Sequence, residues 1–105
     1  MDRLLQILSE MALPFAYGHF AEGESPNTPF ICYLLPGSDN FSADGRVYYK
    51  INEVHIELYC DSKNPALEAT LEAVLDEHGI FYNKTEVWIE SEKLYEVLYT
   101  FEMEV

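Results

Sequence analysis

Hydrophobic and polar residues alternate along Val54–Asp61, where an apolar side chain falls on every second position. This period of two predicts a β-strand with one buried face, and eight residues of strand would span about 26 Å. Just upstream, the apolar residues Val47, Tyr49 and Ile51 fall on the opposite parity. Because the period of a regular strand cannot reverse, the sequence predicts a bulge or bend near Asn52–Glu53.

A helix is predicted shortly after this strand. Asn64 suits the N-cap, Pro65 suits the first helical position, and Gly79 is placed to end the helix in the left-handed conformation. Between them, four apolar residues recur at the spacing of one helix face: Leu67, Leu71, Val74 and Leu75.

The rest of the chain predicts a second helix and further strands. Asp2–Met11 has the pattern of a short amphipathic helix. Phe15–Phe20 is expected to be an edge strand, and the nearly continuous apolar run Phe30–Leu35 a central strand. Glu86–Glu90 and Lys93–Val105 are expected to pair as a hairpin. The apolar face of the N-terminal helix comprises Leu4, Leu5, Ile7, Leu8 and Met11.

The order α-β-β-β-α-β-β predicts an α+β fold, with two helices packed on one face of a mixed, mainly antiparallel sheet. At 105 residues, the chain is expected to form a single domain, residues 1–105. The core of that domain is expected to bring together seven residues: Val54, Ile56, Leu58, Leu71, Val74, Tyr99 and Phe101.

The charge of the chain narrows the classes of function that are expected for it. Nineteen acidic residues face six basic ones, giving a net charge of −13. Direct nucleic-acid binding is not expected, because phosphate contacts need clustered lysine and arginine. The acidic residues could form a solvated surface, hold subunits apart until their partners arrive, or imitate the phosphates of DNA.

Catalytic and metal-binding patterns were also sought in the sequence. The histidines and cysteines show no ligand spacing: His19, His55, His78, Cys32 and Cys60. We found no serine-centred elbow and no glycine-rich phosphate loop, so neither an enzyme nor a cofactor is expected.

The cysteines are expected to be reduced core residues. No apolar stretch is long enough for a membrane span and no signal peptide is recognised, which favours the cytoplasm.

One segment has the composition of an interaction surface. Pro36–Arg46 is expected to be a long polar loop, and the residues after it are expected to project from the sheet as a hairpin arm. Phe41 could serve as an apolar anchor and Arg46 as a cation for an acidic neighbour. Tyrosine is enriched at interfaces because its ring and hydroxyl both find partners. The candidate oligomer or partner interface is therefore Phe41, Arg46, Tyr48, Tyr49 and Lys50.

The whole chain resembles small phage or prophage proteins of the tail-completion and tail-terminator type. An N-terminal helix, DRLLQILSEMALPFAYGHF, runs into an edge strand, and the loop PGSDNFSADGR then enters the long strand VYYKINEVHIELYC. The acidic helix in NPALEATLEAVLDEHGIFYN and a terminal hairpin follow. The stretch INEVHIELYCDSKNPALE carries most of the resemblance.

The resemblance implies an α+β subunit with no catalytic residue. It also implies a homo-oligomeric ring, typically hexameric, at the end of the tail that meets the head, in contact with other head and tail proteins. Such a protein would be made in the host cytoplasm and end in the virion tail or neck. Two other functions stay open: a small acidic inhibitor or DNA mimic that binds a basic host partner, and a cytosolic enzyme subunit or ligand-binding domain.

Overall fold

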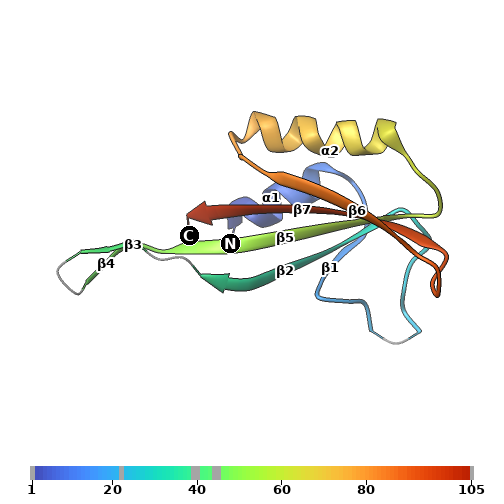
Figure 1. Ribbon diagram of the computed structural model, residues 1–105, viewed down its shortest axis with the longest axis horizontal. Helices are drawn as coiled ribbons and strands as arrows, with labels where there is room; N and C mark the ends of the chain where they lie inside the picture. The colour runs from blue at the N-terminus through green and yellow to red at the C-terminus, as the bar shows by residue number, and fades with distance from the viewer. Residues whose placement is uncertain (1, 22, 39–40, 44–45, 105) are drawn as a thin grey trace.

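The computed structural model describes residues 2–21, 23–38, 41–43 and 46–104, without the side chains of residues 2, 41–43 and 46–49. A five-stranded sheet in the order β1-β2-β5-β7-β6 carries two helices, and β3 and β4 form a separate pair (Figure 1). The elements are α1 (Asp2–Glu10), β1 (Phe15–Tyr17), β2 (Phe30–Ser38), β3 (Phe41–Ala43), β4 (Arg46–Tyr49), β5 (Ile51–Cys60), α2 (Pro65–Glu77), β6 (Asn83–Ile89) and β7 (Leu94–Glu104).

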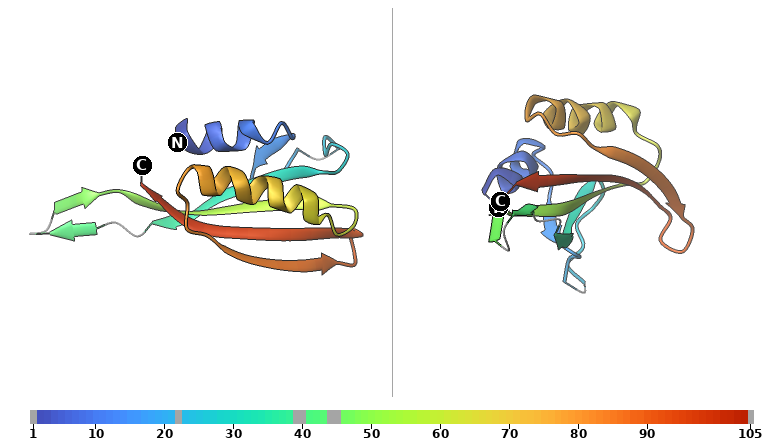
Figure 2. Two further views of the ribbon diagram at one scale, coloured as in Figure 1. Left: turned by 90° about the horizontal axis from the view of Figure 1, so that it is seen from above. Right: turned by 60° about the vertical axis from the view of Figure 1, so that its left-hand side comes forward.

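The predicted architecture is confirmed. β1 pairs with β2 in parallel and every other pair in the sheet is antiparallel. Both helices lie on the same face of the sheet (Figure 2), and their apolar side chains share one cluster with that face. The strands of this sheet and the helices follow the predicted order α-β-β-β-α-β-β, with β3 and β4 inserted between β2 and β5.

The run Phe30–Leu35 forms an interior strand of the sheet, as predicted, and the middle strand of the five is β5. That run forms most of β2, which lies between the edge strand β1 and β5. β5 is central because it pairs along its whole length with β7, from Ile51 opposite Glu104 to Cys60 opposite Tyr95. Apolar side chains on both faces of β2 are still buried, since the segment before β2 covers its second face through the edge-to-face contact of Phe20 with Phe30.

The predicted bulge near Asn52–Glu53 is wrong. β5 pairs with β7 without interruption through these residues. The change of parity needs no interruption: Ile51 and Val54 both belong to β5, and residues three positions apart in a regular strand lie on opposite faces. The irregularity in the sheet falls in β2, between Leu34 and Gly37. That position contains Pro36, and a bulge tolerates a proline because the proline has no ladder N–H to donate.

The predicted loop Pro36–Arg46 is also wrong in its described part. β2 continues through Ser38, which is the register partner of Asn52, and β3 and the start of β4 fall inside the same range. Positions 39–40 and 44–45 lie outside the described residues. The polar composition was misleading because backbone pairing at an exposed end of a sheet does not need apolar side chains.

Local sequence determines both ends of α2. The side chain of Asn64 accepts a hydrogen bond from the backbone N–H of Leu67 at 3.1 Å, and Pro65 begins the helix. At the other end Gly79 has a φ of 69°, and the N–H of Ile80 donates to the carbonyl of Leu75 at 3.0 Å. This pattern is the Schellman motif, in which a left-handed glycine lets the chain satisfy the last carbonyls.

The core lies between the helices and the sheet. All seven residues predicted for it belong to this cluster, with Val74 partly buried at its margin. α1 contributes Leu4, Ile7 and Leu8, whereas Leu5 is 37% exposed. Leu5 was wrongly placed on the buried face because successive helical residues differ by about 100° around the axis, which turns Leu5 away from Leu4.

Candidate functional site

The β3–β4 pair extends from one end of the body as a separate antiparallel hairpin, here called the arm (Figure 1). It lengthens the molecule, whose principal extents are 49 × 30 × 23 Å. In the arm, Phe41 pairs with Tyr49 and Ala43 pairs with Arg46. An isolated two-stranded hairpin is at best marginally stable in water, so this arm has much to gain from a partner.

The structure brings the five predicted interface residues onto this one feature. Arg46 and Tyr49 are the first and last residues of β4, and Phe41 begins β3. The register shift between Phe41 and Ser42 leaves Tyr48 as the extra residue of β4. Their side chains lie outside the described part of the structure. Lys50 is described, and it is exposed at the root of the arm.

Most of the other basic residues are held within the body. Arg3 donates to the backbone carbonyl of His78, and Lys93 pairs with Glu90. Lys63 and Lys84 both bind the carboxylate of Glu68. The two remaining cations of the six in the sequence are Arg46 and Lys50, which both belong to the arm and its root. The stretch Arg46–Lys50 is therefore locally basic in a strongly acidic chain, and Asp44 precedes it in the sequence.

A network of opposite charges joins α2 to β6. Glu68 on α2 is only 2% exposed, and the Nζ atoms of Lys63 and Lys84 each lie 2.8 Å from its carboxylate. Burial disfavours the charged form of Glu68, but the hydrogen bonds from the two lysines outweigh it, so the pKa of the carboxyl is lowered. The pKa of Glu72 is lowered for the same reason, because hydrogen bonds outweigh the effect of burial. The Glu72 carboxylate accepts hydrogen bonds from Lys84 at 2.7 Å and from the Tyr99 hydroxyl at 2.8 Å. The network stabilises the fold.

A hollow of about 520 Å³ lies beside the root of the arm, where β7 ends and β6 begins. Among the described residues, its lining has apolar side chains and three charged ones. The apolar residues include Ile80, Phe101 and Met103, and the charged residues are Arg3, Glu102 and Glu104. Phe81 borders this hollow with 88% of its surface exposed, which leaves its ring almost wholly in water. An exposed phenylalanine next to a hollow with a partly apolar lining is typical of an interaction surface.

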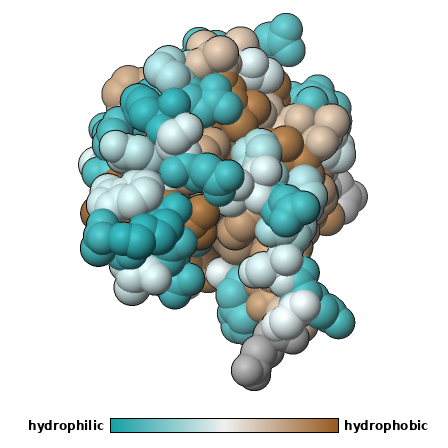
Figure 3. Space-filling model, turned by 90° about the vertical axis from the view of Figure 1, so that its right-hand side faces the viewer, coloured by the Kyte–Doolittle hydropathy of each residue, from teal (hydrophilic) through white to brown (hydrophobic). Residues whose placement is uncertain are grey.

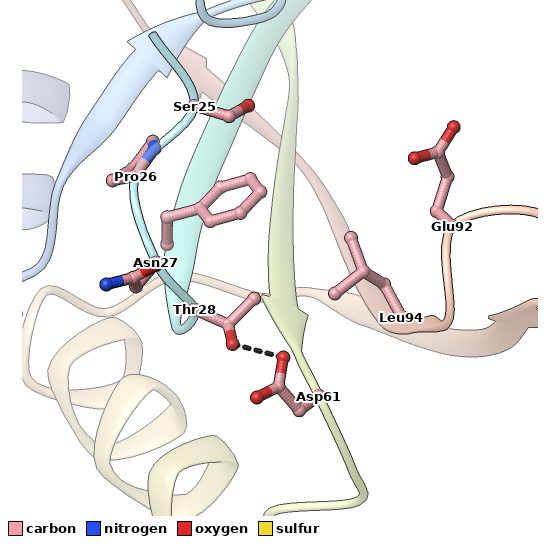
Figure 4. A pocket seen from close by; sticks show the side chains of 8 residues that line it. Ser25, Pro26, Asn27, Thr28, Asp61, Glu92 and Leu94 are labelled. Atoms are coloured by element: carbon pink, nitrogen blue, oxygen red, sulfur yellow. Dashed lines mark hydrogen bonds between the residues drawn. The ribbon is translucent and has the colours of Figure 1, made fainter. Parts of the chain in front are cut away.

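The opposite end of the molecule has a second hollow, of about 400 Å³. Figure 3 shows this end, where apolar patches lie among hydrophilic side chains. The segment Ser25–Thr28 forms one wall, and Glu92 and Leu94 lie across from it (Figure 4). The Thr28 hydroxyl donates to Asp61. The polar residues that line this hollow are Ser25, Asn27, Thr28, Asp61 and Glu92.

The helix-free face of the sheet has a pair of carboxyl groups. Glu57 on β5 and Glu96 on β7 lie diagonally across the two strands, where Tyr59 is the register partner of Glu96. Burial, and then the charge and hydrogen bond of Glu57, raise the pKa of Glu96. The Tyr59 hydroxyl donates to Glu57 at 3.2 Å. Two carboxylates this close repel each other, so the pair costs stability when both are ionised.

The candidate ligand residues from the sequence do not converge on a metal site. Within the described residues, no three histidine, cysteine, aspartate or glutamate side chains are placed to hold a metal ion. His55 pairs with Glu53 at 3.1 Å and His78 with Glu10 at 2.8 Å, at separate positions. Cys32 and Cys60 are buried free thiols, as expected. Burial and the nearby Glu57 raise the pKa of the Cys32 thiol to about 11, so it stays protonated near neutral pH.

Sequence reasoning missed Phe81 as a surface residue. A signal was available in the run Ile80–Tyr82, because an extended segment can bury only alternate side chains. Ile80 is buried at 8% exposure, so Phe81 must point away from the core. Reasoning from the sequence also missed the Glu57–Glu96 pair and the Glu68 network, which depend on strand register and helix docking.

No protein-family model matches the chain, and no curated protein matches it in sequence. Among the helices that the structure describes, none combines the length and the apolar character needed to cross a membrane.

Proposed function

We propose that this chain is a non-enzymatic assembly protein of a phage or prophage particle, a ring component that terminates the tail or joins it to the head. The observation that carries the proposal is the projecting arm on an α+β body. The arm holds the basic residues Arg46 and Lys50 in a chain with a net charge of −13. A locally basic stretch on an acidic body is suited to contacts between like subunits.

The edges of the sheet support the same proposal. β1 and β6 are its two edge strands, so each carries backbone groups on one side that pair with no strand of this sheet. The two edges differ in sequence and length, so a contact between them would be heterologous. Heterologous contacts close into rings when the rotation between subunits allows it.

The overall negative charge is suited to a subunit that stays monomeric until its partners are present. Subunits that share a large negative charge repel one another in solution, which keeps them monomeric at low concentration. Association then depends on local contacts strong enough to overcome the repulsion, such as those on a ring already begun by other head or tail proteins. The proposed localisation is accordingly the virion tail or neck after synthesis in the host cell.

The test is deletion of this chain from the phage or prophage that encodes it, followed by negative-stain electron microscopy of the particles. The expected result is filled heads that lack joined tails, or tails of irregular length, with normal particles restored by the wild-type chain. Particles with normal tails and normal infectivity after the deletion would contradict the proposal.

The net charge of −13 also favours a second candidate function, that of an acidic DNA mimic. A DNA mimic would bind a basic protein in competition with duplex DNA, and its affinity would fall steeply with salt. Capture of a host DNA-binding protein that duplex DNA releases would favour this candidate over the assembly role.

A further inference from the structure

We propose that the hollow beside Phe81 receives the arm of a second copy of this chain. This inference rests on the proposed function and specifies the partner and the surface through which subunits meet. It is carried by the chemistry of the hollow, the chemistry of the arm, and the direction in which the arm leaves the body.

The hollow has a lining that is partly apolar and partly charged. Its lining includes the nearly buried apolar residues Ile80, Phe101 and Met103, and the exposed ring of Phe81 stands beside them. Glu102 and Glu104 give the hollow negative charge, against the cation Arg3, which donates to the backbone carbonyl of His78. An occupant with apolar or aromatic side chains and a positive charge would match both properties.

The arm has that chemistry. The sequence of β4 is Arg46-Val47-Tyr48-Tyr49, and Lys50 follows it. The other four basic residues of the chain are already bound within the body, by His78, Glu68 and Glu90 among others. In a second copy of this chain, the stretch Arg46–Lys50 is therefore both aromatic and basic, and it forms one strand of the arm and its root.

The arm of the same molecule is poorly placed to fill its own hollow. Lys50 alone separates β4 from β5, and Ile51 is already paired with Glu104 at the end of the sheet. The arm consequently continues outward beyond the end of β7, away from the body (Figures 1 and 2). Each molecule thus presents an arm and an unfilled hollow at the same end, which is the arrangement that a second copy can satisfy.

The first experiment measures self-association of the full chain by sedimentation velocity over a concentration series at about 0.15 M salt. Phe81→Ser should weaken the association constant about tenfold or more, because a central aromatic anchor is lost. Leu5→Ser is the matched control: Leu5 is an exposed apolar residue of α1 that is neither in the lining of the hollow nor on an edge strand, so this change should leave association unaltered. Both side chains are exposed, so both variants should fold.

The second experiment separates local charge from net charge. Glu104→Lys makes the chain less acidic, so general repulsion would fall and association would rise if net charge alone mattered. The proposal predicts weaker association, because the border of the hollow would repel the arm. Glu92→Lys makes the same change in charge at the opposite end of β7, and it should strengthen association.

The third experiment identifies the arm as the occupant. Arg46→Glu alone should weaken association, and an equimolar mixture of Arg46→Glu with Glu104→Lys should associate more strongly than either variant by itself. Rescue in the mixture requires an arm of one molecule in the hollow of another. Contacts between two arms would give no such rescue and would contradict the inference.

Wild-type protein that stays monomeric at every concentration, or a Phe81→Ser variant that associates like wild type, would overturn this inference. The Phe81→Ser result would not bear on the proposed function, whereas a wild-type chain that is monomeric under every condition would also count against a self-assembling ring. The particle morphology after deletion tests the proposed function separately. If the arm instead binds a different protein of the particle, arm variants should block assembly of particles while the purified chain remains monomeric. This outcome would also overturn the inference.

Discussion

Ile51 and Glu104 are register partners at the end of the sheet from which the arm extends. This pairing anchors the first residue of β5 directly after Lys50, so the root of the arm is held by the central strand of the body. The arm itself forms no part of the five-stranded sheet. Its contribution to the stability of the monomer should be small, and its contribution to contacts between molecules should be large.

Replacement of Phe41 by alanine tests this division directly. We expect the free energy of unfolding of the purified monomer to change by less than about 0.5 kcal/mol, as for surface positions in general. Assembly of particles should nevertheless be impaired. Urea denaturation and particle counts by electron microscopy measure the two effects, and a loss of several kcal/mol in the monomer would place Phe41 in the core instead.

The core between the helices and the sheet should respond in the opposite way. Ile56 and Leu71 are both fully buried, and truncation of either to alanine should cost about 2–5 kcal/mol because the cavity is only partly refilled. Thermal or urea unfolding measures the loss. An unchanged midpoint for either variant would show that the helix-facing side of the sheet has been assigned wrongly.

The Glu68 network should make stability depend on pH in the acidic range. The lowered pKa of Glu68 and Glu72 means that their contribution is present above the unfolded carboxyl value of about 4.3 and is lost as pH falls through the folded values. Glu68→Gln should cost about 1–3 kcal/mol at pH 7, and less as the pH is lowered below about 4. Urea denaturation at several pH values measures this, with exposed Glu92→Gln as the control.

The contribution of Glu96 to stability should depend on pH with the opposite sign. Its raised pKa means that the folded state is favoured while Glu96 is protonated, and this contribution is lost as pH rises from about 4.3 through the folded pKa. At pH 7 the ionised Glu96 is repelled by Glu57, so Glu96→Gln should stabilise the protein. The gain should vanish below about pH 4. Destabilisation by Glu96→Gln at pH 7 would show that the carboxylate has a favourable partner instead.

The sequence predicted the parts of the fold whose causes are local. Asn64, Pro65 and Gly79 specify the ends of α2 through caps within a few residues, and alternation specifies the buried faces of β5 and β7. The bulge near Asn52–Glu53 was predicted wrongly because Ile51 and Val54 can lie on opposite faces of one regular strand, so a change in apolar parity does not require an interruption. Pairing of Ser38 with Asn52 was missed because polar composition carries no information about a distant backbone partner.

The candidate site was predictable to the same extent. The aromatic and basic residues around Tyr48 predict an interaction segment, which stays a prediction, and of the five candidate side chains the structure describes that of Lys50, which is exposed. The hollow beside Phe81 was not predictable, because it is built where the end of β7 meets the start of β6. The Glu57–Glu96 pair likewise depends on the register that places Tyr59 opposite Glu96.

Sedimentation velocity of the purified chain across a salt series tests the central claim, that this is a subunit which self-associates once its charge is screened. The net charge of −13 gives long-range repulsion, and the screening length falls from about 30 Å at 0.01 M to about 10 Å at 0.1 M salt. Salt screens both the local pairs between arm and hollow and the general repulsion, and the repulsion between net charges of −13 dominates the salt response because the local pairs are few. The account predicts monomer in dilute, low-salt buffer and larger species as salt is raised. A shift towards smaller species with added salt, or monomer under every condition, would contradict it.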